Sequence, residues 1–205
     1  YSYPKGFTSL PKDGMDYTSI LKDDSAKPYS YLHVSNCRLT AFNLIKNQLT
    51  TAGTGNDTDL WLMFDIDAID TMPEYQLTKE ERADFLTLFN QVSVEGTSTL
   101  EEHEEKIQEA WKERDIQISG DKLSLISVYL HAPEDQARFV GHTGVLADTK
   151  EGLLFVEKYS AMDPFQATYF KDRAELKDYL LARPDLYGDK TELAPIIMEN
   201  GNVME

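Results

Sequence analysis

The single cysteine of this 205-residue chain, Cys37, stands where a helix is predicted to begin. The predicted helix covers residues 35–49, with Ser35 or Asn36 as its N-cap and apolar residues at helical spacing. A thiol in the first turn of a helix lies near unpaired N–H groups and the positive end of the helix dipole, which favour the thiolate. Cys37 is therefore a candidate nucleophile. The alternative is a small residue buried by packing, since buried cysteines are common.

A nucleophilic cysteine needs a base, and His142 is the best candidate among the four histidines. It stands in VGHTGVL between Gly141 and Gly144, and glycines within a strand often mark the close approach of another group. Such a setting leaves room for a helix N-terminus or a substrate to meet the imidazole. The alternative is a strand histidine whose hydrogen bonds are satisfied by a neighbour.

The other three histidines are weaker candidates for this base. His103 lies in EEHEEK on a charged helical face, where we expect it to be solvated. His131 ends a predicted strand beside a proline, and nothing distinguishes it. His33 precedes Cys37 by four residues and could reach it only if the loop folds back.

Hairpin geometry predicts the third member of the site, Glu157. A two-residue loop at Thr149-Lys150 would place Glu157 directly across from His142, where a carboxylate could orient the imidazole. A four-residue loop would keep Glu157 on the same face, because strand side chains alternate with period two. An odd-length loop would put Lys158 there instead. Asn36 or Gln166 could donate a side-chain hydrogen bond to an oxyanion, and the sequence does not select between them.

The elements that must position these residues follow from periodicity and capping signals. The stretch DLWLMFDIDAID, residues 59–70, is interpreted as a mostly buried strand. Two helices follow, one beginning near Thr78 and one near Ser98-Thr99, each with a glutamate three residues after a threonine N-cap. After Gly120 the period changes to that of strands. Four strands are predicted, over residues 122–132, 137–148, 152–160 and 166–170. A helix over residues 172–184 and a last strand over residues 193–200 follow, with a closing hairpin turn at Gly201.

Helices followed by an antiparallel meander indicate an α+β fold. The chain is long enough for one domain, which we place at residues 31–205, with a helical insertion at about 74–118. Residues 1–30 show no sustained period and are predicted to form an N-terminal arm.

Acidic residues outnumber basic ones, 36 against 20, and the formal net charge of −16 argues against nucleic-acid binding. No apolar run is long enough to span a bilayer. A single cysteine excludes an internal disulfide and any structural zinc site built on several thiolates.

Asp65 and Asp67 lie on one face of the predicted strand, with Asp70 just beyond, and clustered carboxylates can bind calcium. The glycine and distal glutamate of an EF-hand loop are missing, so we interpret the cluster as an acidic strand end. The sequence therefore predicts no metal and no other cofactor.

Several motifs taken together carry a resemblance to a known family: NCRLTAF, GHTGVL, GLLFVEK, PFQATYF and IIMENG. Over residues 31–205 the chain resembles uncharacterised Gram-positive surface lipoproteins that share a domain of unknown function. The resemblance implies an extracellular, cell-surface location, with a membrane link only through an N-terminal lipid anchor absent from this chain. It implies no activity, because the family has none established.

More distantly, the order of residues is similar to that of NlpC-type papain-like cysteine hydrolases. Those enzymes place a cysteine at a helix start, a histidine in a His-x-Gly strand and a polar residue on the next strand, which Cys37, His142 and Glu157 match. The chain departs from them at Asn36-Cys37-Arg38-Leu39, where Asp-Cys-Ser-Gly is usual. The third member of its site, Glu157, is an acid where histidine is often found, and the insertion between Cys37 and His142 is longer.

We therefore predict a papain-like α+β core in which the helix bearing Cys37 packs on an antiparallel sheet. The predicted function is a cysteine hydrolase or acyltransferase acting on an amide bond, with a peptide or peptidoglycan-like substrate. Cys37 would be the nucleophile, His142 the base and then the acid, and Glu157 the orienting group. The alternative is a non-catalytic cell-surface binding lipoprotein that keeps the fold while Cys37 serves as packing. A structural adhesin domain, with neither a cleft nor a reactive thiol, is a third possibility.

Overall fold

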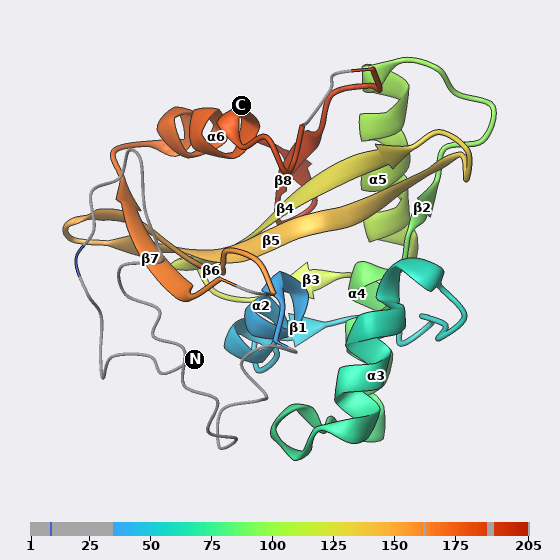
Figure 1. Ribbon diagram of the computed structural model, residues 1–205, viewed down its shortest axis with the longest axis horizontal. Coiled ribbons are helices and arrows are strands. Elements are labelled where there is room, and N and C mark those ends of the chain that lie inside the picture. Colours follow the sequence, from blue (N-terminus) through green and yellow to red (C-terminus); the bar gives the residue numbers. More distant parts are fainter. Residues whose placement is uncertain (1–8, 10–34, 162, 188–190, 205) are drawn as a thin grey trace.

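A seven-stranded antiparallel sheet organises the computed structural model, which describes residues 9, 35–161, 163–187 and 191–204 (Figure 1). The strand order is β7-β6-β5-β4-β8-β9, and β2 pairs with β5 beyond the end of β6. The strands are β2 (Val92–Ser93), β4 (Leu123–Ala132), β5 (Ala137–Thr149), β6 (Gly152–Lys158), β7 (Phe165–Phe170), β8 (Ile196–Glu199) and β9 (Asn202–Val203). A separate two-stranded ladder joins β1 (Leu49–Thr50) to β3 (Gln117–Ile118).

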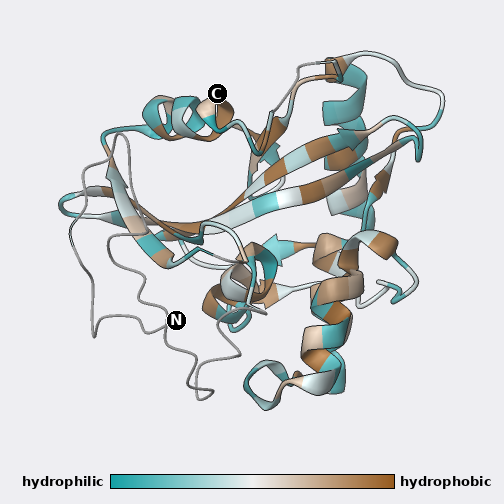
Figure 2. Ribbon diagram, viewed as in Figure 1, coloured by the Kyte–Doolittle hydropathy of each residue, from teal (hydrophilic) through white to brown (hydrophobic). Residues whose placement is uncertain are grey.

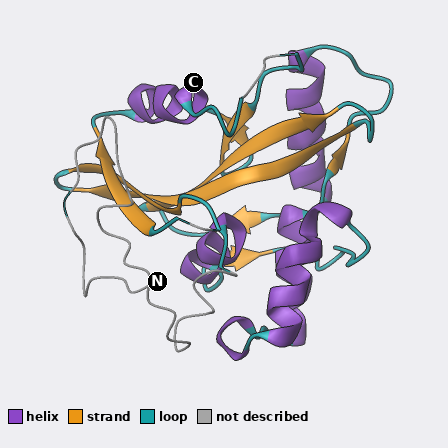
Figure 3. Cartoon of the chain, viewed as in Figure 1, coloured by secondary structure: helices purple, strands orange, loops and turns teal. Residues whose placement is uncertain are grey.

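Five α-helices lie within the described residues (Figure 3). They are α2 (Cys37–Ile45), α3 (Met63–Thr71), α4 (Lys79–Phe89), α5 (Leu100–Glu113) and α6 (Arg173–Ala182), with 3-10 turns η3 (Leu60–Leu62) and η4 (Pro73–Tyr75). The predicted starts of α4 and α5 are confirmed. Thr78 and Thr99 each form a full capping box with the glutamate three residues later. The helix at Cys37 ends at Ile45, four residues before the predicted end.

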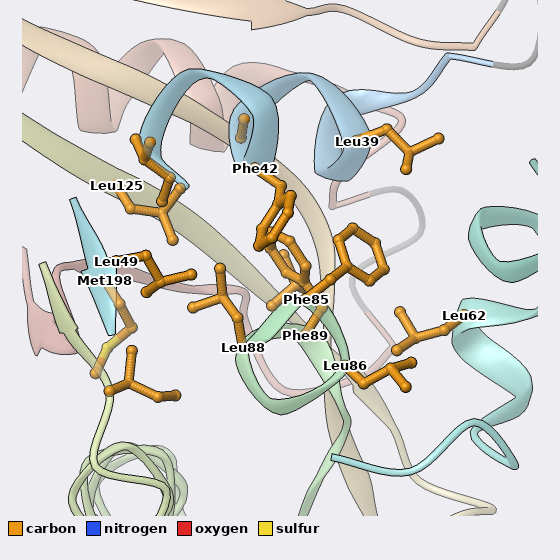
Figure 4. Close-up of a cluster of buried hydrophobic side chains, with 14 of the residues drawn as sticks. Leu39, Phe42, Leu49, Leu62, Phe85, Leu86, Leu88, Phe89, Leu125 and Met198 are labelled. Carbon is orange, nitrogen blue, oxygen red and sulfur yellow. The ribbon is translucent and has the colours of Figure 1, made fainter. Parts of the chain in front are cut away.

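The two faces of the sheet bury separate cores. On one face α2, α3, α4 and α5 contribute to a large cluster, in which Phe42 and Phe85 meet edge to face with ring centroids 5.3 Å apart (Figure 4). On the other face α6 covers a smaller cluster through Leu176 and Leu180. Figure 2 shows the bands of hydrophobic residues along the long strands β4 and β5 that supply both clusters. The predicted α+β fold is thus confirmed, with the helix of Cys37 packed on an antiparallel sheet.

The predicted strand at residues 59–70 is wrong, because this stretch forms η3 and α3. Its buried positions, Asp59, Leu62, Asp65, Ala68 and Ile69, recur at intervals of three or four residues, which is helical spacing. An aspartate at a core position and the exposed Leu60 and Phe64 hide this period in the sequence. Asp65 and Asp67 consequently do not share a strand face. Asp65 is fully buried, whereas Asp67 is exposed.

The expectation that His103 is solvated is also wrong. Its side chain is buried and Nδ1 accepts a hydrogen bond from Arg138 Nε at 3.0 Å. His103 continues the buried face of α5 one turn ahead of Ile107, Ala110 and Trp111, because residues four apart lie on the same side of a helix.

The predicted N-terminal arm, residues 1–30, falls almost wholly outside the described residues, as does His33. The predicted insertion contains α4 and α5, and also β2, which joins the main sheet, and β3. The boundaries of 31–205 as one domain stay a prediction. Among the described residues, no helix is long and apolar enough to cross a bilayer.

Candidate active site

The candidate site lies where β5 changes its neighbour. Along one edge β5 pairs with β6 from Thr149 to Gly144 and with β2 at Arg138 and Ala137, which leaves residues 139–143 without a ladder partner there. Along the other edge β5 pairs with β4, and a bulge leaves Gly141 unopposed, between Val128↔His142 and Tyr129↔Val140. Bulges reverse the alternation of side chains, and Val140 and Leu146 accordingly pack into opposite cores.

The N-terminus of α2 meets this unpaired edge. Cys37 is the first residue of the helix, and its Sγ lies 3.9 Å from the carbonyl oxygen of Gly141. Asn36 is the N-cap, and its Oδ1 accepts a hydrogen bond from the Leu39 N–H at 2.9 Å. The predicted helix-start position of the thiol is therefore confirmed. Cys37 as a residue is 9% exposed and counts as buried.

Arg38 fixes the helix N-terminus to the sheet and to α3. Its guanidinium donates to the Val140 carbonyl at 2.7 Å, to the Trp61 carbonyl at 3.0 Å and to Asp65 Oδ2 at 2.6 Å. Asp65 also accepts from the Asn36 amide at 2.7 Å. This buried ion pair explains why an aspartate occupies a core position of α3, since a buried charge needs a partner.

His142 joins the thiol to a carboxylate. Its side chain lies near enough to the Cys37 thiol to shift the pKa of that thiol, and its Nε2 lies 2.5 Å from Glu157 Oε2. The hairpin loop is Lys150-Glu151, so Glu157 pairs with Gly144 rather than with His142. The predicted register is wrong by two residues, while the predicted face is right, because a shift of two preserves the alternation. His142 Nε2 faces the carboxylate.

Four polar groups surround the buried Glu157 carboxylate. Besides His142, Oε2 accepts from Arg183 Nη1 at 3.0 Å. Oε1 accepts from Gln166 Nε2 at 2.6 Å and from the Tyr179 hydroxyl at 2.9 Å. Arg183 is itself held by Asp185 at 2.7 Å and lies over the Tyr159 ring at 3.7 Å from the ring centroid. Glu157 therefore remains ionised without contact with solvent.

The charges of the site favour a thiolate beside an imidazolium. Burial raises the pKa of the Cys37 thiol, but the hydrogen bond and charge of His142 and the charge of Arg38 outweigh it, so the thiol pKa is lowered. Burial opposes a charge on His142 as well, but Cys37 and Glu157 together raise its pKa to about 9. Burial also acts against the Glu157 carboxylate, yet His142 and Arg183 hold its pKa below the usual range. These opposite shifts are typical of paired catalytic groups.

The chain matches a family model described as a domain of unknown function, DUF4300, over residues 3–204. The chain belongs to this family. No curated protein and no solved structure matched it. The predicted membership of a family without assigned activity is confirmed, whereas the likeness to NlpC-type enzymes stays a prediction.

The structure of this DUF4300 chain brings Cys37, His142 and Glu157 together and places the two amide candidates beside them. Asn36 is engaged at both ends of its amide, by Asp65 and by the Leu39 N–H. Gln166 donates to Glu157 Oε1, the oxygen that does not face His142, and at 2.8 Å to the Tyr179 hydroxyl. In this arrangement Asn36 serves as a helix cap and Gln166 as a support of Glu157.

Three residues of the DUF4300 site were not predicted from the sequence: Arg38, Tyr179 and Arg183. Arg38 stands next to the cysteine, and its charge beside a predicted buried helix start was a signal that could have been used. Tyr179 and Arg183 come from α6 and its C-cap, and no local pattern points from them to a strand 22 or 26 residues earlier.

The described part of the chain contains no group of three or more metal-ligating side chains. Asp65 binds Arg38, and Asp70 binds Arg82 at 2.5 Å, so two of the three carboxylates considered for calcium are occupied by arginines.

Proposed function

We propose that this DUF4300 chain is a cysteine hydrolase or acyltransferase acting on an amide bond in a peptide of the cell-wall type. One observation carries the proposal: the helix-start thiol of Cys37 lies near enough to His142 for each to shift the pKa of the other, and His142 Nε2 lies 2.5 Å from Glu157 Oε2. That arrangement fulfils the roles of nucleophile, base and orienting group in cysteine and serine hydrolases.

The chemistry follows from the ionisation of the pair. The Cys37 thiolate attacks the amide carbonyl carbon, a C–S bond forms, and the carbonyl oxygen becomes an oxyanion. Both ends of the Asn36 amide are already bonded, so that charge would be stabilised by backbone N–H groups at the start of α2 other than that of Leu39, which donates to Asn36. The imidazolium of His142 then protonates the leaving amine as the C–N bond breaks.

The resulting thioester is resolved by a second attack. With water as the acceptor, His142 takes its proton, the C–S bond breaks, and a carboxylic acid and the thiol are released. With an amine as the acceptor, the same sequence yields a new amide, and the reaction is acyl transfer. Glu157 keeps the ring oriented through both halves and stabilises the imidazolium.

We further propose a papain-like core and a cell-surface location, as a lipoprotein. The helix of Cys37 packed on an antiparallel sheet and the order Cys37, His142, Glu157 support the papain-like assignment. The location rests on the resemblance to Gram-positive surface lipoproteins alone.

A second candidate function is a non-catalytic binding lipoprotein. The small exposed fraction of the Cys37 residue, 9%, favours it, because a binding module can keep Cys37 as inert packing. The two functions make opposite predictions for the reactivity of the thiol in the folded protein.

The experiment that separates them is the rate of Cys37 alkylation by iodoacetamide as a function of pH, in the wild type and in His142→Ala. Because Cys37 is the only cysteine, the total rate reports on this thiol alone. We expect the wild-type rate to titrate below the free-thiol value of about 8.5 and the variant to titrate higher. A thiol that reacts only after unfolding would exclude the enzyme and leave the binding protein.

A further inference from the structure

A cavity of about 490 Å³ adjoins the site, although Cys37 and His142 do not line it. Three of the residues that line the cavity each contact a residue next to Cys37 or His142. Leu130 lies directly above Gly141, where an added Cβ would fall 2.3 Å from Leu130 Cδ1, and the Gly141 carbonyl faces the thiol. The Trp61 carbonyl accepts from Arg38, and Asp185 holds Arg183, whose Nη1 lies 3.2 Å from His142 Nε2.

Two stacked aromatic rings form part of the lining of this cavity. The Trp61 ring stacks on Phe139 with centroids 3.7 Å apart and an interplanar angle of 9°. Three prolines complete the wall: Pro133, Pro184 and Pro195. A cavity of this volume, lined by both apolar and charged side chains, can accept a small ligand or a side chain of a larger one.

The charged side chains that line the cavity are all acidic. They come from three separate segments of the chain: Glu134 and Asp135 in the β4–β5 turn, Asp185 after α6, and Glu192 before β8. Of these four, only Asp185 has an ion pair among the described residues, with Arg183. No lysine or arginine is part of this lining. Arg138 is fully buried and engaged by His103 and by the carbonyls of Tyr129 and Ala194.

We propose that this cavity is the substrate subsite for a peptide residue whose side chain is an alkyl chain ending in an ammonium group, as in lysine. The alkyl stem would lie on the Trp61–Phe139 wall and the ammonium group among the carboxylates, as such side chains bury their stems and keep the charge at a polar rim. The negative lining supplies the charge complementarity that selects a cation over a neutral or acidic residue. The inference rests on the proposed function, because the cavity serves the same peptide that Cys37 would cleave.

The test measures binding by calorimetry on Cys37→Ala protein, so that catalysis plays no part. The probes are three capped tripeptides, Ala-Lys-Ala, Ala-Nle-Ala with norleucine in place of lysine, and Ala-Glu-Ala. We expect the lysine peptide to bind at least about tenfold more tightly than the norleucine peptide, and the glutamate peptide not to bind. Equal affinity for the lysine and norleucine peptides, or no binding of either at millimolar concentration, would overturn the subsite.

Matched charge variants locate the binding. Glu134→Gln/Glu192→Gln removes two exposed carboxylates of the cavity and should weaken lysine-peptide binding roughly three- to tenfold. Glu101→Gln/Glu105→Gln removes the same charge from the exposed face of α5 and should leave the affinity within about twofold. Equal losses in both variants would mean that the net charge of −16, not the cavity, attracts the peptide.

The two proposals fail separately. An unreactive thiol together with selective lysine-peptide binding would remove the enzyme and leave the subsite in a binding protein. An activated thiol without lysine-peptide binding would keep the enzyme and discard this subsite.

Discussion

Arg183 donates from Nη1 to Glu157 Oε2 across 3.0 Å, the same oxygen that faces His142 Nε2. Both side chains are almost completely removed from solvent, 4% exposed for Arg183 and 0% for Glu157. A guanidinium, a carboxylate and an imidazolium thus share one buried location, and the carboxylate lies against both cations, while Asp185 also pairs with Arg183.

Replacing Arg183 by glutamine should destabilise the fold by about 3 kcal/mol, because breaking a buried ion pair leaves its partner's charge uncompensated. Urea unfolding at neutral pH measures the change in free energy. Arg173→Gln is the matched control, since Arg173 pairs with Glu199 at the surface and should cost less than about 1 kcal/mol. Equal losses for the two arginines would show that the Arg183 pair behaves like a surface pair.

The lowered pKa of Glu157 makes part of the stability pH-dependent. A carboxylate whose pKa is lower in the folded state than its ordinary 4.5 stabilises the fold above that value. This contribution is lost as the pH falls through the folded-state pKa. Wild type should therefore lose more free energy of unfolding between about pH 7 and pH 3 than Glu157→Gln, measured by urea unfolding. The exposed control Glu101→Gln should follow the wild type, and parallel curves for wild type and Glu157→Gln would contradict the buried charge.

Arg38 and Asp65 should move the thiol pKa in opposite directions. Burial and Asp65 raise the pKa of Cys37, whereas His142 and Arg38 lower it. Arg38→Gln should therefore shift the pH profile of Cys37 alkylation upward, and Asp65→Asn should shift it downward, both by iodoacetamide kinetics. A shift of both profiles in the same direction would mean that the variants displace the helix N-terminus rather than change the local charge.

Gly141 should resist substitution because of one neighbour. An added Cβ would lie 2.3 Å from Leu130 Cδ1 and 2.5 Å from Leu130 Cγ, so Gly141→Ala should cost about 1–3 kcal/mol through overpacking. In a Leu130→Ala background, Gly141→Ala should cost less free energy of unfolding than it does in the wild type. A double-mutant cycle of urea unfolding energies measures this coupling. Strict additivity of the two changes would rule out the contact as the reason for the glycine.

The parts of the fold predicted correctly depend on local signals. The capping boxes at Thr78 and Thr99 involve residues three apart, and the strands after Gly120 follow period-two patterns separated by turns. The stretch that was interpreted as a strand, residues 59–70, fails because its buried face includes Asp65, whose burial depends on Arg38, 27 residues earlier. A local pattern cannot reveal a partner at that distance in the sequence.

Local patterns likewise predict one part of the candidate site and not the other. The face shared by His142 and Glu157 follows from the alternation of one hairpin, and it holds even though the register is shifted by two residues. Tyr179 and Arg183 join Glu157 only because α6 packs back over the sheet, which depends on the tertiary fold. The prediction of His103 as solvated fails for a different reason. His103, Ile107 and Trp111 are spaced four residues apart and share the buried face of α5, but the charged residues around His103 hide this spacing.

The edge of β5 that lacks a ladder partner could pair with a strand of another molecule. Unpaired strand edges invite pairing with another chain, and residues 139–143 form such an edge in the middle of the sheet. Here the Val140 carbonyl accepts from Arg38, and the Cys37 thiol covers the carbonyl of Gly141. The residues that assemble the candidate nucleophile therefore also block this edge, so that loss of the α2 N-terminus would expose a template for intermolecular β-sheet growth.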